Sequence, residues 1–275
     1  MNKLIVVAVV VVAACQADNK NLERKIEDLN KKLDTLSAQL ARGGAGAGAQ
    51  QRQARAEPDR AKTYAVPIDG DPVEGPADAK VTLVKAYDYA CPFCEKVRDA
   101  MDELRKKYPN DLRIVYKQLV VHPQQAHAAA LAACAADKQG KFREFDTLLW
   151  DEGYKKRQFE NACWDAPAGC PIMVGFAQQL GLNADKFKAD MKGDCQQLVQ
   201  KDMKELAALG VGSTPTFFIN GRYMVGAAPT ESFVALVDEE LKKANERIAA
   251  GTPAASYYQQ VVLDKGVKQL ERPQQ

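Results

Sequence analysis

Two short motifs, far apart in the chain, hold the residues that could carry out chemistry. The first is a pair of cysteines in Cys91-Pro92-Phe93-Cys94. The second is the stretch from Gly212 to Gly221, which contains Thr214-Pro215. Thiols separated by two residues can close a short disulfide, so the first motif indicates a thiol-disulfide redox centre.

The cysteine pair falls where a strand gives way to a helix. Residues 81–87 are typical of a buried strand, and apolar residues return at helical spacing after the pair. Pro92 suits the first helical position, which makes Cys91 the N-cap. Its sulfur can then accept hydrogen bonds from the N–H groups of Phe93 and Cys94, and the helix dipole also favours the thiolate. We therefore predict Cys91 as the nucleophile and Cys94 as the resolving thiol.

Zinc binding is the main alternative role for this pair. Zinc takes about four ligands, but the chain has no second Cys-x-x-Cys, and its only histidines are His122 and His127. Cys163 and Cys170 could complete a set of four. The strand-to-helix junction favours the redox centre, so we expect neither a metal nor another cofactor.

The composition is that of an ordinary globular protein. Of the 275 residues, 46% are hydrophobic and 27% are charged. The 38 basic and 36 acidic residues give a net charge of +2. This balance favours neither nucleic acid nor acidic substrates as partners.

The N-terminus carries the pattern of an export signal. An apolar run over residues 4–14 follows Met1-Asn2-Lys3 and is too short for a stable membrane span. It ends in Val12-Ala13-Ala14-Cys15, which resembles the lipobox of bacterial lipoproteins. The resemblance implies a signal peptide over residues 1–14 and a lipid on Cys15. A plain signal peptide followed by an incidental cysteine is the alternative.

Export would place the remaining cysteines in an oxidising compartment, where disulfides persist. Cys163 and Cys170 flank a turn-rich loop, so we predict a structural disulfide between them. Cys134 lies in an alanine-rich segment and is expected to be a small buried residue. Cys195 either pairs with Cys134 or stays free, and the spacing does not decide between these outcomes.

A heptad pattern follows the signal. Leucine and isoleucine recur at spacings of four and three over residues 22–40, which predicts a short coiled coil within residues 15–42 and a homo-oligomer of unspecified size. A single amphipathic helix lying on a neighbour or on the membrane is the alternative. Residues 43–62 are rich in Gly, Ala, Arg and Gln and are predicted to form a flexible linker.

Residues 63–250 form the predicted catalytic domain. A β-α-β half over residues 81–117 and a β-β-α half over residues 216–247 would share one sheet, with a helical insertion at about 124–210 between them. This order predicts an α/β, thioredoxin-like fold with an inserted helical cap, preceded by the N-terminal coiled-coil helix. An edge strand is expected near residues 64–66, and a C-terminal helix and tail over residues 251–275.

The chain resembles the DsbA-type thiol-disulfide oxidoreductases over residues 70–245. The resemblance rests on Asp88 to Cys94, on the alanine-rich segment after His122-Pro123, and on Ser213 to Gly221. It implies that Pro215 is cis and faces the cysteine pair, and that Thr214 offers its N–H and C=O to an extended substrate peptide. Phe93 would join this substrate-binding surface.

Two residues depart from the family's pattern. Strongly oxidising relatives have histidine where this chain has Phe93, which predicts a lower oxidising power. Where family members have a buried acid, six residues before the first cysteine, this chain has Lys85, and Asp88 is the nearest alternative acid. Lys85 and Asp88 are candidates for tuning the thiol pKa values, although we expect each of them, and Lys117, to be a surface or salt-bridged residue.

These features predict an enzyme of the bacterial envelope, held on the periplasmic side by its lipid. It would exchange disulfides with exported proteins as an oxidase, reductase or isomerase, and a membrane protein would be its redox partner. The alternative, from another class, is a lipid-anchored scaffold or a copper- or zinc-binding protein that uses the same thiols.

Overall fold

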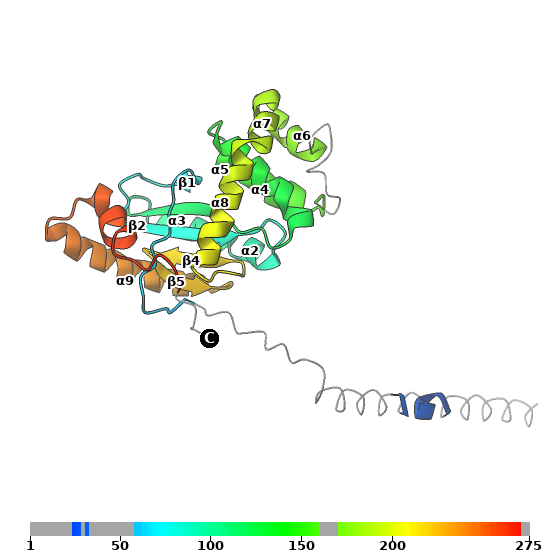
Figure 1. The fold of residues 1–275 in the computed structure, drawn as a ribbon, viewed down its shortest axis with the longest axis horizontal. Helices are drawn as coiled ribbons and strands as arrows, with labels where there is room; N and C mark the ends of the chain where they lie inside the picture. Colours follow the sequence, from blue (N-terminus) through cyan, green and yellow to red (C-terminus); the bar gives the residue numbers. More distant parts are fainter. Residues whose placement is uncertain (1–23, 29–30, 33–57, 160–169, 271–275) are drawn as a thin grey trace, which may run out of the picture. The chain divides into compact units, whose positions relative to one another are not determined.

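The structure is a computed structural model that describes residues 24–28, 31–32, 58–159 and 170–270 (Figure 1). The chain separates into two compact units, Met1–Arg55 and Ala56–Gln275. In the first unit, residues 24–28 are helical, as the heptad pattern predicts. Cys15, Cys163, residues 43–57 of the linker and most of the heptad seam lie outside the described residues.

The second unit is built on a five-stranded sheet with the strand order β1-β3-β2-β4-β5. Strand β2 (Val81–Tyr87) runs parallel to β3 (Leu112–Gln118) and antiparallel to β4 (Thr216–Ile219). The edges are β1 (Val73–Glu74), antiparallel to β3, and β5 (Arg222–Val225), antiparallel to β4. This sheet and its helices confirm the predicted fold class.

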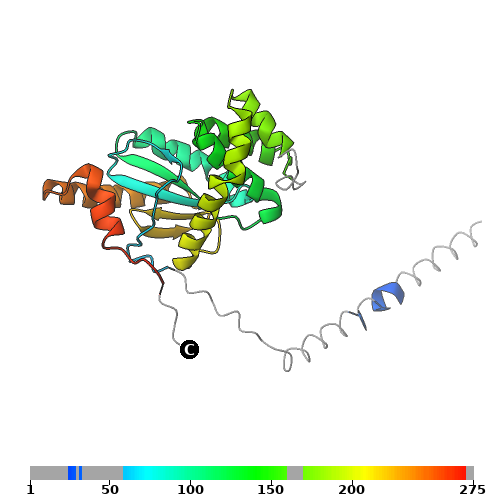
Figure 2. The same cartoon turned by 45° about the horizontal axis from the view of Figure 1, so that its top comes forward.

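Helices follow the two halves of the sheet and fill the insertion between them. The helix after β2 is interrupted at Val97, which gives α2 (Pro92–Lys96) and α3 (Arg98–Lys107). Helix α9 (Thr230–Ala249) follows β5. The helices of the cap are α4 (Pro123–Asp137), α5 (Phe142–Leu148), the π-helical turn η1 (Leu149–Tyr154), α6 (Pro171–Gln179), α7 (Ala184–Lys192) and α8 (Asp194–Ala208). Figures 1 and 2 show α4 to α7 gathered beyond one end of the sheet, with α8 returning toward β4.

The two ends of this unit differ from the prediction. The expected strand over residues 64–66 forms only isolated bridges, Thr63 to Arg222 and Tyr64 to Val267, and β1 is the edge strand instead. The C-terminal helix is reduced to two short turns, η2 (Ala254–Ser256) and η3 (Tyr258–Leu263). At Gly266 the chain passes so close to Tyr64 and Ala65 that a Cβ would lie 2.7 Å from the Ala65 nitrogen. This close approach favours an extended tail over a longer helix.

The sheet separates two hydrophobic clusters. On one face, Leu83 and Tyr87 of β2 pack with α2, α3, α9 and the cap. On the other, Val84 and Ala86 pack with the end of α8 and the C-terminal turns. Because alternate residues of a strand point to the same side, Lys85 lies on the face of the first cluster. Within the described residues, no helix is both long and apolar enough to span a membrane.

Candidate active site

Cys91 and Cys94 lie at the junction between the sheet and α2. Cys91 is the N-cap of α2 with extended backbone angles, and Pro92 occupies the first turn. The Cys91 carbonyl accepts hydrogen bonds from the N–H groups of Cys94, at 3.1 Å, and Glu95, at 3.3 Å. Both cysteines are free thiols; Cys91 is 4% exposed and Cys94 is fully buried. A substrate can therefore reach the pair only from the side of Cys91.

The two sulfurs differ strongly in acidity. A hydrogen bond from the Cys94 thiol is the largest cause that lowers the pKa of Cys91 to about 5, against the opposing effect of burial. The backbone N–H groups of Cys94 and Phe93 lower this pKa further. Burial, followed by the same hydrogen bond, raises the pKa of Cys94. At neutral pH, Cys91 is thus a thiolate and Cys94 holds its proton.

Thr214 and Pro215 face this pair from β4. The Thr214–Pro215 peptide is cis, as the resemblance implies. Pro215 immediately precedes β4, whose first residue, Thr216, pairs with Ala86 near the end of β2. This register brings the Thr214 carbonyl to 3.3 Å from the Cys91 sulfur, close enough to accept a hydrogen bond from the protonated thiol.

Phe93 is the exposed member of the motif. Its side chain is 52% exposed, and the Lys96 ammonium lies 5.4 Å from the centre of its ring. Val121, at 38%, is another large hydrophobic side chain left exposed in the same unit. Because Phe93 directly follows Pro92 in the first turn of α2, it offers apolar surface next to the reactive sulfur.

Asp88 fixes the loop that leads into Cys91. Its carboxylate is fully buried and accepts hydrogen bonds from the backbone N–H groups of Ala90, at 2.7 Å, Val121, at 2.6 Å, and His122, at 2.8 Å. The imidazole of His122 lies 3.3 Å from the same carboxylate. Asp88 therefore joins the loop before Cys91 to the loop before α4. Of the two expected outcomes, a surface or a salt-bridged residue, its burial excludes the first.

Lys85 and Lys117 lie on opposite faces of the sheet. Lys117 is fully buried away from the cysteines. Its ammonium donates a hydrogen bond to Asp71 at 2.7 Å and forms ion pairs with Asp202 at 2.7 Å and Glu205 at 2.9 Å, which excludes it from the site. Lys85 is 3% exposed on the face of the cysteines. The expectation that Lys85 is a surface or salt-bridged residue is therefore wrong.

The cap places two further polar side chains on the side of the sheet that carries the cysteines. Asp146 of α5 is buried and has electrostatic contact with Lys85. Tyr154, at the end of η1, has its pKa raised by burial and by the charges of Glu95, Cys91 and Cys94. Neither residue was predicted from the sequence. An aspartate next to Phe145, within the apolar pattern of that helix, was the available signal for Asp146.

The remaining described cysteines lie in the cap. A disulfide joins Cys134 of α4 to Cys195 of α8, with the Cα atoms 5.7 Å apart, which resolves the pairing that the spacing left open. Cys170 at the start of α6 is also disulfide-bonded. Its predicted partner, Cys163, lies outside the described residues.

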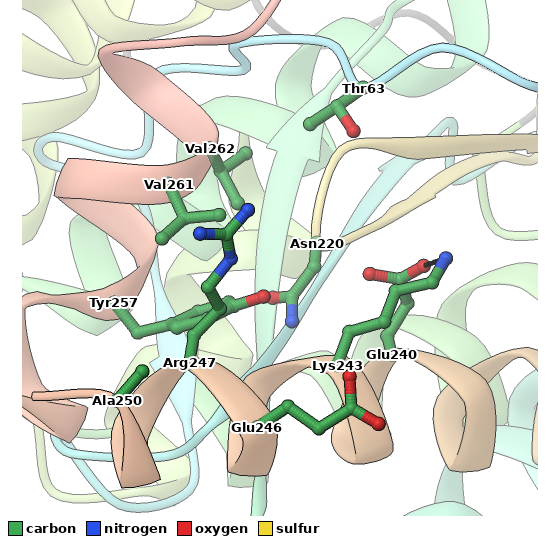
Figure 3. Close-up of a pocket in the computed structure, with 10 residues that line it drawn as sticks. All are labelled: Thr63, Asn220, Glu240, Lys243, Glu246, Arg247, Ala250, Tyr257, Val261 and Val262. Atoms are coloured by element: carbon green, nitrogen blue, oxygen red, sulfur yellow. Dashed lines mark hydrogen bonds and ion pairs between the residues drawn. The ribbon is translucent and has the colours of Figure 1, made fainter. Parts of the chain in front are cut away.

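A separate pocket lies at the opposite end of the short strand β4 from Thr214–Pro215 (Figure 3). The pocket is lined by Thr63, which precedes the sheet, and by residues of the β4–β5 turn, of α9 and its C-cap, and of the C-terminal turns: Asn220, Glu240, Lys243, Glu246, Arg247, Ala250, Tyr257, Val261 and Val262. None of them is a thiol. Across the part of the chain that the structure describes, no three His, Cys, Asp or Glu side chains are grouped to hold a metal ion.

Comparison with known proteins places this site within a known domain. A family model described as Thioredoxin matches residues 68–239. Among curated proteins, the chain is 29% identical over 193 residues to the Na(+)/H(+) antiporter NhaA of Herminiimonas arsenicoxydans, covering 69% of this chain and 29% of that protein. It is 36% identical over 181 residues to NhaA 1 of Salinispora arenicola, covering 62% and 25%. The chain thus spans less than a third of the length of these relatives.

Several solved structures share the fold. BdbD from Bacillus subtilis has a TM-score of 0.57 at 22% identity, covering 68% of this chain and all of that one. α-DsbA1 from Wolbachia pipientis has a TM-score of 0.56 at 16% identity, covering 66% and 96%. A thioredoxin-like oxidoreductase from Silicibacter pomeroyi has a TM-score of 0.53 at 24% identity, covering 63% and 94%.

Proposed function

Because this chain belongs to the thioredoxin family, we propose that it is a thiol-disulfide oxidoreductase that exchanges disulfides with exported proteins through Cys91 and Cys94. One observation carries the proposal: the Cys94 thiol lowers the pKa of Cys91, the less buried of the two cysteines, to about 5, and the Thr214 carbonyl lies 3.3 Å from the Cys91 sulfur. A structural cysteine pair needs neither feature.

The two sulfurs divide the reaction between them. In the oxidising direction, a substrate thiolate attacks the Cys91 sulfur of the Cys91–Cys94 disulfide, and Cys94 leaves and takes up a proton. A second substrate thiolate then attacks the substrate sulfur of the mixed disulfide and releases Cys91 as a thiolate. Two electrons pass from the substrate to the cysteine pair. In the reducing direction the same steps run backwards.

The surface around Cys91 suits an extended peptide. Thr214 offers backbone groups beside the reactive sulfur, and Pro215 has no N–H that would compete for the peptide's carbonyl groups. The ring of Phe93, two residues after Cys91, supplies exposed apolar surface. Thr214, Pro215 and Phe93 are therefore the proposed substrate-binding residues.

The acidity of Cys91 favours the oxidase direction. A pKa of about 5 stabilises the reduced pair, because its thiolate persists at neutral pH while the disulfide gains nothing from it. The low pKa of Cys91 therefore raises the oxidising power, whereas Phe93 in place of histidine is predicted to lower it. An isomerase would need its thiols to stay reduced, and therefore shielded from a membrane oxidant. A coiled coil over residues 22–40 would favour such shielding by holding several domains together.

The proposed location is the bacterial envelope, on the periplasmic side. The buried Cys134–Cys195 disulfide supports an oxidising compartment. Cys15 would carry the lipid, and a membrane protein would act as the redox partner. Metabolic labelling with a fatty acid tests the anchor: Cys15→Ser is expected to remove the label, and a label that persists would contradict lipidation at Cys15.

Equilibration of the full chain with glutathione tests the function and its direction. We expect the unmutated chain to form the Cys91–Cys94 disulfide reversibly, with a potential nearer the oxidising end of the range of about −120 to −270 mV found in this fold. Reduced, unfolded ribonuclease should then regain activity in its presence. Cys91→Ser should abolish both results, and failure of the unmutated chain in both assays would refute the proposal.

A further inference from the structure

Lys96 is an exposed lysine on the redox helix that has no acidic partner within the described residues. It is the last residue of α2 and follows Phe93 by three positions, so the two side chains share one face of the helix. Its ammonium lies 5.4 Å from the centre of the Phe93 ring. Asp99, the next acidic residue of the chain, lies beyond the interruption at Val97 and makes no ion pair with it. A positive charge thus accompanies the exposed apolar ring next to Cys91.

Glu95, the only other charged residue of α2, is already compensated. Its carboxylate forms an ion pair with Lys155, just after η1, at 3.5 Å. Lys155 also pairs with Asp151 at 3.1 Å, and Asp151 accepts a hydrogen bond from Arg98 of α3 at 2.7 Å. These two acids and two bases join the redox helix to the cap and together carry no net charge. Lys96 stands outside this network, so its charge is free to attract an acidic group.

Three loops next to the reactive sulfur add no acidic side chain: residues 121–125, 211–215 and 226–229. Asp88 ties the first loop to the one before Cys91 through buried hydrogen bonds. The Thr214 carbonyl lies 3.3 Å from the Cys91 sulfur, and the Pro215 carbonyl accepts a hydrogen bond from the Gly226 N–H at 2.9 Å. A histidine is the only base in the three loops. A peptide that binds across them therefore meets a surface without exposed acids and with an uncompensated lysine at its α2 side.

We infer that the enzyme prefers substrate segments in which an acidic side chain and an apolar one lie within a few residues of the reactive cysteine, and that Lys96 sets the preference for the acid. The apolar side chain contacts the Phe93 ring, and the carboxylate lies near the Lys96 ammonium. Lys96 is a specificity residue, since it takes no part in the exchange of disulfides. The inference rests on the proposed function and deepens it, because it names the class of segment that the same site accepts.

The size of this preference follows from the exposure of the lysine. An ion pair on the surface stabilises a complex only weakly, so one carboxylate near Lys96 should raise the rate of exchange by about threefold. A lysine in the same place of the substrate should lower the rate by a similar factor. Salt at about 1 M shortens the Debye length to about 3 Å and should remove both effects, whereas apolar contact with Phe93 would persist.

Oxidation of short reduced peptides by the oxidised full chain measures the preference. Three peptides share two cysteines and a phenylalanine and differ only in their flanking residues, which are Glu, Gln or Lys. Two electrons pass from the peptide thiols to the Cys91–Cys94 disulfide, so the peptide becomes a disulfide and the cysteine pair becomes reduced. Each rate is divided by the rate of the same peptide with dithiodipyridine, an uncharged disulfide, because the flanking charges also change the reactivity of the peptide's own thiols.

The normalised rates in the unmutated chain should fall in the order Glu, Gln, Lys, with about threefold between neighbours. Lys96→Gln should make the three rates equal, and Lys96→Glu should reverse their order. Lys107→Glu is the matched control. Lys107 is also exposed, and its ammonium lies 5.3 Å from the ring of Tyr108, but it is the last residue of α3, at the end away from α2. This variant should keep the order of the unmutated chain.

Equal normalised rates for the three peptides in the unmutated chain would overturn the inference, and so would a preference for Glu that survives in Lys96→Glu. Alkylation of Cys91 by iodoacetamide, an uncharged reagent, separates an effect on the peptide from one on the thiol. Its pH profile should be the same in Lys96→Gln as in the unmutated chain, and a displaced profile would contradict a role in specificity alone. Failure of the unmutated chain to oxidise any of the peptides would instead count against the proposed function.

Discussion

The hydrogen bond between the two thiols makes the acidity of Cys91 depend on Cys94. We expect the rate of Cys91 alkylation by iodoacetamide to rise with pH around a midpoint of about 5, since the thiolate is the reacting form. Cys94→Ala removes the strongest influence that lowers this pKa, so the midpoint should move upward. Stopped-flow alkylation between pH 3 and pH 10 measures both profiles.

The Cys94→Ala variant also shows how much of this acidity comes from the start of α2. The N–H groups of Phe93 and Cys94 remain in the variant, because both belong to the backbone. The midpoint should therefore stay below the ordinary thiol pKa of about 8.5. An unchanged midpoint in Cys94→Ala would show that the contact between the two thiols does not set the acidity.

Among the elements of the cap, α4 and α8 are joined by the Cys134–Cys195 disulfide, which closes a loop with a sequence separation of 61. Replacing both cysteines by alanine should lower the free energy of unfolding by about 2–4 kcal/mol, because the unfolded chain regains the freedom of that loop. Urea denaturation of the oxidised chain measures the loss.

This double variant should leave the redox site intact, since the disulfide does not involve α2 or β4. Its Cys91 alkylation profile is expected to match that of the unmutated chain. If the alkylation midpoint shifts in the double variant, the cap disulfide influences the acidity of Cys91, and the prediction is wrong.

The elements that carry the site were predictable, but the contacts between elements were not. The motif at Cys91 and Cys94 follows from local spacing, and Pro215 from the resemblance of its segment to a known family. Asp146 accepts a hydrogen bond from Tyr89, two residues before Cys91, only because the cap folds over the sheet, a long-range contact that no local pattern encodes. Lys85 was expected to be a surface or salt-bridged residue because a lysine is rarely buried without a partner.

Across the whole catalytic unit, the Lys117 cluster makes stability depend on pH. Burial and the neighbouring Asp202 raise the pKa of Asp71 to about 8 from an ordinary value of 3.8. The folded chain therefore keeps a proton that the unfolded chain has already lost, so stability should fall as pH rises from about 4 to about 8. Urea midpoints measured over this range, with the cysteine pair oxidised, test the sign.

The cysteine pair must be oxidised in this measurement, because reduced Cys91 makes stability rise with pH, opposite to the effect of Asp71. Its lowered pKa adds stability that is fully present above the ordinary thiol pKa and is lost as pH falls toward 5. Asp71→Asn should flatten the profile of the oxidised chain. If the urea midpoint of Asp71→Asn falls with pH as steeply as that of the unmutated chain, a group other than Asp71 causes the pH dependence.

The burial of the disulfide between α4 and α8 limits the stage of folding at which it can form. Cys134 is 4% exposed and Cys195 is fully buried, so this bond must form before or during the packing of the cap. If the chain is exported as proposed, it arrives with these thiols reduced, and an oxidant has to reach them while the cap is still open. Under the proposed function, every copy is thus first a client of disulfide formation and only afterwards a catalyst of it.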